Sequence, residues 1–145
     1  MTCFWTGILS TLTIEELKST LDITNKHPQE FIKGLKQKSI QTKNVLWQDS
    51  ELSSKQIEEN MEHIKDFKPN SINGGYFCST CDPFLILICE LFCVNVHHTY
   101  LKSIIKYTRK NDDAKRTLIF QNNRGHFWNQ NRGRNNRGRN RRNNR

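Results

Sequence analysis

Apolar residues recur at helical spacing through the first two thirds of the chain. The pattern predicts amphipathic helices that begin near Cys3, Thr13, Pro28 and Ser53. Thr13 and Ser53 are each followed three residues later by a Glu or Gln, which is the pattern of a capping box, and Pro28 suits a first helical turn. A short extended segment is expected over 40–47. Gly7 interrupts the first helix and indicates either close approach by another backbone or a ligand, or a tolerated defect.

The most apolar run of the chain lies at 81–93. Asp82 can cap a helix there by accepting backbone N–H groups of the first turn, and Pro83 suits the first helical position. The apolar residues fall on every side of the expected helix, which is typical of a helix buried on most faces. At about 1.5 Å per residue the run is too short to cross a bilayer. We therefore expect a central core helix and no membrane partner.

The pattern changes after this run. Short segments rich in β-branched and aromatic residues predict strands at 94–98, 104–108, 116–120 and 126–128. The residues 110–113 are typical of a hairpin turn. Helices followed by strands predict an α+β fold with a small antiparallel sheet.

Composition divides the chain into two parts. Residues 129–145 contain only Asn, Gln, Arg and Gly, so they cannot bury a core, and we expect a disordered tail after a compact domain over 1–128. The chain has 23 basic and 14 acidic residues, a net charge of +9. Without the seven arginines of the tail, 16 basic residues remain against 14 acidic ones, a net of +2. The basic character belongs to the tail.

Arginines spaced by glycine and asparagine resemble the arginine–glycine segments of RNA-binding proteins. Guanidinium groups bind phosphates as a fork and stack on unpaired bases. The tail therefore predicts RNA or DNA binding that is independent of base sequence and weakened by salt. A solubilising tail and a localisation signal are the alternatives. The residues expected to bind nucleic acid are Arg132, Arg134, Arg137, Arg139, Arg141, Arg142 and Arg145.

The five cysteines make an odd number, and nothing ahead of Cys3 has the pattern of a secretory leader. We expect reduced thiols in an intracellular protein that is not secreted. Cys78 and Cys81 have the spacing of one zinc knuckle, but the next two cysteines fall inside the apolar helix. His97 and His98 would face opposite sides of a strand, so at most one could join. We expect no metal, no cofactor and no redox pair.

Cys3 and His126 are the candidates for nucleophilic chemistry. A thiol at a helix N-terminus has its thiolate stabilised by backbone N–H groups, and a histidine from a late strand can act as its base. Spacing alone does not bring these two residues together. The alternative is a small N-terminal residue and a histidine at a sheet edge.

The stretch 3–12 is similar to the nucleophile helix of the ovarian-tumour (OTU) family of cysteine proteases, in which a cysteine followed by large apolar residues opens a helix. The run 82–96 looks like that family's later helix and core strand. Residues 124–128 resemble its histidine strand, in which an aromatic residue follows the catalytic histidine. The resemblance implies an OTU-like layout and a deubiquitinase-type hydrolase with Cys3 and His126 as catalytic dyad, acting on ubiquitin or a related modifier.

The chain departs from the OTU pattern at two places. OTU enzymes carry an acidic loop before the cysteine, where this sequence has Met1 and Thr2. They place a polar orienting residue two positions after the histidine, where this sequence has Trp128. A reduced enzyme with a dyad and an inactive descendant both fit this pattern. In the second case the domain is a non-catalytic scaffold that presents the nucleic-acid-binding tail.

The stretches 2–9, 78–92 and 123–128 also look like small uncharacterised proteins of giant DNA viruses, similar to those of mimiviruses. That resemblance implies a viral origin and a place in the host cytoplasm or the virion. It implies no activity.

Overall fold

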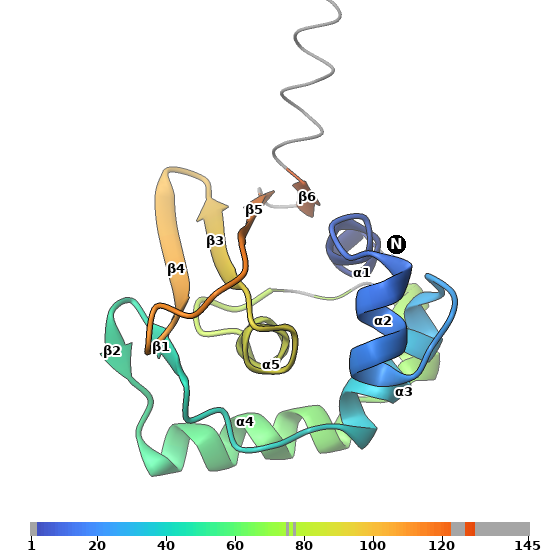
Figure 1. Ribbon diagram of the computed structural model, residues 1–145, viewed down its shortest axis with the longest axis horizontal. Helices are drawn as coiled ribbons and strands as arrows, with labels where there is room; N and C mark the ends of the chain where they lie inside the picture. The colour runs from blue at the N-terminus through green and yellow to red at the C-terminus, as the bar shows by residue number, and fades with distance from the viewer. Residues whose placement is uncertain (1–2, 75, 77, 123–126, 130–145) are drawn as a thin grey trace, which may run out of the picture.

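Helix α5 (Pro83–Phe92) lies at the centre of the molecule (Figure 1). The computed structural model describes residues 3–74, 76, 78–122 and 127–129. The carboxylate of Asp82 caps α5, because Oδ1 accepts the backbone N–H groups of Phe84 at 3.0 Å and Leu85 at 3.1 Å. The side chains from Phe84 to Cys89 are all fully buried. The predicted core helix is confirmed.

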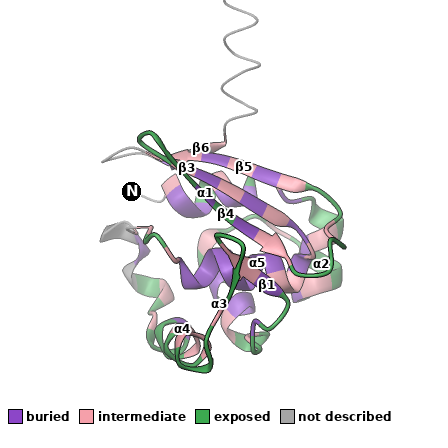
Figure 2. Ribbon diagram, turned by 90° about the vertical axis from the view of Figure 1, so that its left-hand side faces the viewer, coloured by how far each residue is buried: buried purple, intermediate pink, exposed green. Residues whose placement is uncertain are grey.

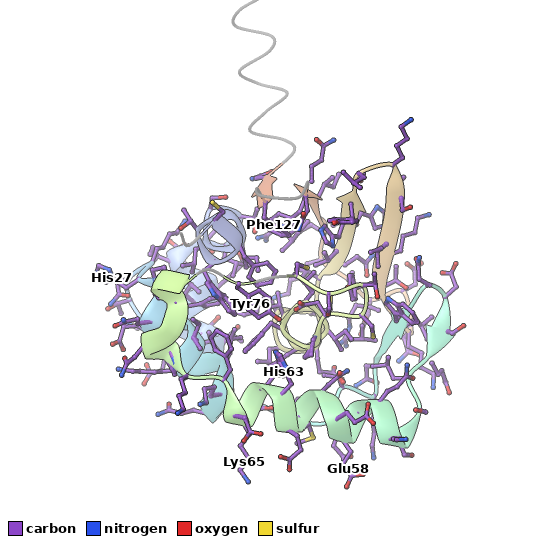
Figure 3. All side chains as sticks on the ribbon, turned by 180° about the vertical axis from the view of Figure 1, so that it is seen from behind. His27, Glu58, His63, Lys65, Tyr76 and Phe127 are labelled. Carbon is purple, nitrogen blue, oxygen red and sulfur yellow. The ribbon has the colours of Figure 1, made fainter. Side chains whose placement is uncertain are left out.

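In the described part of the chain before α5, four further α-helices and a 3₁₀ helix are present. They are α1 (Cys3–Leu9), α2 (Ile14–Leu21), α3 (Pro28–Gln37), α4 (Ser54–Asp66) and η1 (Pro69–Gly74). Both predicted capping boxes are present, at Thr13 with Glu16 and at Ser53 with Gln56. Figure 3 shows Glu58 and Lys65 of α4 pointing away from the protein, whereas Ile64 is buried. The helical period predicted these helices because each buries one stripe of side chains.

The strands form one six-stranded sheet with the order β2-β1-β4-β3-β5-β6. They are β1 (Val45–Trp47), β2 (Ser50–Glu51), β3 (Asn95–Tyr100), β4 (Ser103–Arg109), β5 (Thr117–Asn122) and β6 (Phe127–Asn129). The structure is thus α+β, as predicted. The sheet is not purely antiparallel, however, because β3 and β5 pair in parallel. The expectation of a small antiparallel sheet is wrong in this respect.

The reason for the parallel pair lies in the connection from β4 to β5. Residues 110–113 do not form a hairpin turn, because β4 and β5 are not neighbours in the sheet. Beyond this turn, Lys115 N–H donates to Cys93 C=O, and Asn95 N–H donates to Arg116 C=O. These bonds carry the chain past the start of β3, so that β5 pairs along the other edge of β3. The hairpin is instead the β3–β4 turn, where Leu101 has a φ of 55°, in the left-handed region.

The helices and the sheet share one core. Helix α5 contacts α4 and three strands, β1, β3 and β4, and Figure 2 shows it buried along most of its length. The inner face of β3 is formed by alternate buried residues. At the other end of the sheet, α1 lies directly on β6 (Figure 1).

An ion pair joins the central helix to the sheet. Arg109 of β4 donates to Glu90 of α5 at 2.7 Å and to Asp113 at 2.8 Å, and the Glu90 side chain is only 4% exposed. The Glu90 carboxylate also accepts the backbone N–H of Asn44 at 3.0 Å. These contacts fix the end of α5 that lies opposite to Asp82. Within the described ranges, the helices are all too short or too polar to pass through a bilayer.

Candidate functional site

Cys3 lies in the first turn of α1, as predicted, and is half-buried. Helix α1 packs on β6 through Gly7, where a Cβ atom would lie 3.0 Å from Phe127 Cδ1. The rings of Phe4 and Phe127 are 4.8 Å apart between centroids, and Figure 3 shows Phe127 beside α1. Gly7 is thus a point of close approach, but the neighbour is an aromatic side chain and not the backbone or ligand that the sequence predicted.

His126 directly precedes β6 but lies outside the described residues, as do the seven tail arginines Arg132, Arg134, Arg137, Arg139, Arg141, Arg142 and Arg145. The structure brings the Cys3 helix next to the strand that follows His126. The position of the imidazole and the course of the tail lie outside what is described.

A different thiol and imidazole lie within contact distance. Cys78 Sγ is 3.7 Å from His98 Nδ1. Cys78 comes from the loop before α5, and His98 comes from the inner face of β3, where it is 1% exposed. His97 is half-buried on the alternate side of the strand, as the sequence predicted. The strand alternation thus selects His98 as the partner of Cys78.

A pocket of about 220 Å³ lies over this pair. Its lining residues come from the loop before α5 and from the β3–β4 hairpin, and they are Cys78, Ser79, Thr80, His98, Tyr100 and Ile105. Ser79 and Thr80 are exposed, so the pocket has its mouth beside the loop. Within the described part of the chain, His98 Nε2 is buried and has no hydrogen-bond partner.

The loop that carries Cys78 is held by the buried carboxylate of Asp82. While Oδ1 caps α5, Oδ2 accepts the hydroxyl of Tyr76 at 2.8 Å and the backbone N–H of Ser79 at 3.2 Å. One residue therefore fixes both the start of the helix and the loop next to Cys78.

The carbonyl of Thr80 is the second anchor of this loop. It accepts Trp47 Nε1–H at 2.7 Å and the Tyr107 hydroxyl at 3.0 Å. The Tyr107 hydroxyl oxygen also accepts the backbone N–H of Asp82 at 3.0 Å. Strands β1 and β4 thus hold the loop in place through side chains far away in sequence.

Burial and the charge of Asp82 determine the protonation of the pair. Burial first, and then the nearby Asp82 carboxylate, raise the pKa of the Cys78 thiol. Burial lowers the pKa of His98 to about 4. Burial also raises the pKa of Asp82, against the hydrogen bonds from Tyr76 and the backbone. At neutral pH, Cys78 is accordingly a thiol and His98 a neutral imidazole.

All five cysteines lie in the described part of the chain, and none of them forms a disulfide. Cys89 is fully buried in α5, and Cys93 Sγ donates to the carbonyl of Asp113 at 3.3 Å. Burial raises the pKa of half-buried Cys81 to about 11. Among the residues that the structure describes, no three Cys, His, Asp or Glu side chains come together in a way that could hold a metal ion.

The sequence suggested Cys78 and His98 as possible zinc ligands, and it did not predict that they form a thiol–imidazole pair. Because side chains alternate between the two faces of a strand, the sequence of β3 could have predicted that His98 faces the core. The sequence carried no signal for the position of the loop 78–82. That position depends on hydrogen bonds of Trp47 in β1, Tyr107 in β4 and the N-cap residue Asp82 of α5.

Comparison of the chain with models of protein families, with curated proteins and with solved structures gives no match. The functional proposals therefore rest on the residues and geometry of this chain.

Proposed function

We propose that the domain is an OTU-like cysteine-type hydrolase in which Cys3 is the nucleophile and His126 the base. The observation that supports this proposal is the packing of α1 on β6, which brings the helix that carries Cys3 against the strand that begins one residue after His126. Gly7 allows this close approach, because its missing Cβ leaves room for the Phe127 ring.

In this reaction Cys3 Sγ attacks the carbonyl carbon of an amide or isopeptide bond. His126 takes the thiol proton and gives it to the leaving amine, and water then hydrolyses the thioester. The substrate class that follows from the OTU resemblance is ubiquitin or a related modifier.

The test is labelling of the full chain by ubiquitin that carries a C-terminal thiol-reactive warhead. Wild type is compared with Cys3→Ala and His126→Ala, with Cys93→Ala as a matched thiol control. An adduct that is lost in the first two variants and kept in the control supports the proposal. An adduct that persists in Cys3→Ala contradicts it.

The tail supports a second function, nucleic-acid binding. Its seven arginines, without any acidic residue, account for most of the net charge of +9. If every arginine binds one phosphate of a single strand, the slope of log K against log salt is about −5. With a viral origin, as the resemblance implies, the ligand would be met in the host cytoplasm or the virion. In the non-catalytic alternative, the domain serves as the scaffold for this tail.

Fluorescence anisotropy with a labelled single-stranded oligonucleotide tests this function. In the full chain, replacement of the seven arginines by glutamine should abolish binding at low salt. Replacement by lysine preserves the charge and should retain the salt slope, with the affinity lowered because ammonium groups do not stack on bases. Unchanged binding by the glutamine variant would assign the affinity to the domain.

A further inference from the structure

We propose that Cys78 and His98 form a second thiol–imidazole pair, which accepts a small acyl group in the pocket at the start of α5. The pair is independent of Cys3 and His126. Its members are 3.7 Å apart, which is within reach for a hydrogen bond to sulfur. Both side chains line the same pocket of about 220 Å³.

The imidazole has the arrangement that a base needs. Nδ1 faces the Cys78 sulfur, and Nε2 is buried without a hydrogen-bond partner among the described residues. In the tautomer with the proton on Nε2, Nδ1 presents its lone pair to the thiol. The ring of His98 packs against Phe127, with centroids 5.4 Å apart, which fixes its plane.

The thiol hydrogen has three acceptors, which are His98 Nδ1, the carbonyl of Ser79 at 3.6 Å and the carboxylate of Asp82. We assign the removal of the proton to the imidazole, because His98 lines the pocket together with Cys78, whereas Asp82 does not. Asp82 is the charged group that acts on the thiol, and the Tyr76 and Tyr107 hydroxyls interact with it as well. Burial first, and then the negative charge of Asp82, raise the pKa of Cys78 and keep it protonated at rest, so that its reaction depends on the base.

The size and lining of the pocket define the ligand. Its volume is below the roughly 300 Å³ at which pockets begin to enclose drug-sized molecules. Tyr100 and Ile105 supply apolar surface, and the described residues that line the pocket include no Asp, Glu, Lys or Arg. A short, uncharged acyl group such as acetyl fits this description, whereas a peptide side chain with a charge does not.

Acylation and deacylation of Cys78 need no cofactor. Cys78 Sγ attacks the carbonyl carbon of an activated ester or thioester while His98 Nδ1 takes the thiol proton. The bond to the leaving alcohol or thiol breaks, and that group receives the proton from His98. Water, activated by the same imidazole, then hydrolyses the acyl-cysteine thioester to the acid and the free thiol.

The test uses p-nitrophenyl acetate with the full chain. We expect a stoichiometric burst of nitrophenolate, with the acetyl group located on Cys78 of the wild-type chain by peptide mass spectrometry. Cys78→Ser should abolish the burst. His98→Gln should slow it about 100-fold or more, since a positioned base contributes at least that much. Cys81→Ala should leave the burst unchanged, and in Cys3→Ala the acetyl group on Cys78 should remain, which separates this site from the proposed Cys3 site.

Two results would overturn the proposal. One is the absence of an acetyl group on Cys78 of the folded wild-type chain, or its acetylation only after unfolding in urea. The other is an unchanged burst in His98→Gln with a wild-type circular dichroism spectrum. Because the location of the acetyl group is measured on wild type, failure of a variant to fold leaves the test decisive.

Discussion

Replacement of Asp82 by alanine tests whether this carboxylate organises the centre of the molecule. The change removes the acceptor of four donors, which are the backbone N–H groups of Phe84, Leu85 and Ser79 and the hydroxyl of Tyr76. Loss of the helix cap alone costs about 1–2 kcal/mol. Each buried donor that finds no other acceptor adds about 1 kcal/mol or more.

The removal of a fully buried carboxylate offsets part of this loss, because its burial is itself unfavourable. We therefore expect Asp82→Ala to lower the free energy of unfolding by about 3 kcal/mol. Asp82→Asn keeps the cap oxygen but places an NH₂ group against Ser79 N–H, and it should lower the free energy of unfolding by about 1–2 kcal/mol. The assay is urea unfolding followed by tryptophan fluorescence.

Asp66→Ala is the control, because Asp66 is exposed at the end of α4 and its replacement should change stability by less than about 0.5 kcal/mol. The asparagine variant also removes the charge that raises the pKa of Cys78. Its Cys78 should therefore react faster with iodoacetamide at neutral pH than that of wild type. A loss below about 1 kcal/mol in Asp82→Ala would refute this account of the loop and the helix start.

Three further changes test other parts of the structure. Arg109→Ala should lower the free energy of unfolding by about 3 kcal/mol, because it leaves the buried Glu90 carboxylate without its cation. The double variant with Glu90→Gln should recover part of this loss in urea unfolding. Equal losses in the single and the double variant would contradict this role of the ion pair. As pH falls from 6.5 towards 4, the unfolded chain gains a proton that folded His98, with its pKa near 4, does not. The free energy of unfolding of wild type should therefore fall by up to about 3 kcal/mol more than that of His98→Gln over this pH range. Parallel curves of stability against pH for the two proteins would show that a group other than His98 titrates. Gly7→Leu should lower the free energy of unfolding by about 2 kcal/mol, because the new side chain displaces the Phe127 ring. An unchanged midpoint of thermal unfolding would show instead that β6 shifts to make room.

The outcome for the two thiols shows where sequence reasoning about the site succeeds. The first-turn position of Cys3 was predictable, because the apolar period from Phe4 onwards fixes the helix. So was the inward orientation of His98, because side chains alternate along a strand. The contact of His98 with Cys78 was not predictable, since it depends on which strand lies beside the loop.

The sheet shows the same division. The strands were visible as short β-rich segments, but the pairing of β3 with β5 was not. A turn such as 110–113 has the same local sequence whether the next strand pairs with the strand before it or passes to the far edge of β3. That choice is made by contacts distant in sequence, such as the bond from Lys115 N–H to the carbonyl of Cys93.

By itself, the sequence determined the local elements: the capped helices, the core helix with its Asp82 cap, the strand segments and the basic composition after residue 128. These features depend on side-chain period and on hydrogen bonds between residues two to four positions apart. Only the tertiary structure decided the strand order, the position of the loop at Cys78 and the pairing of this thiol with His98. The physical reason is that buried polar groups must find partners, and the partners of the Asp82 backbone N–H and the Thr80 carbonyl come from strands β1 and β4, which only the folded chain brings beside this loop.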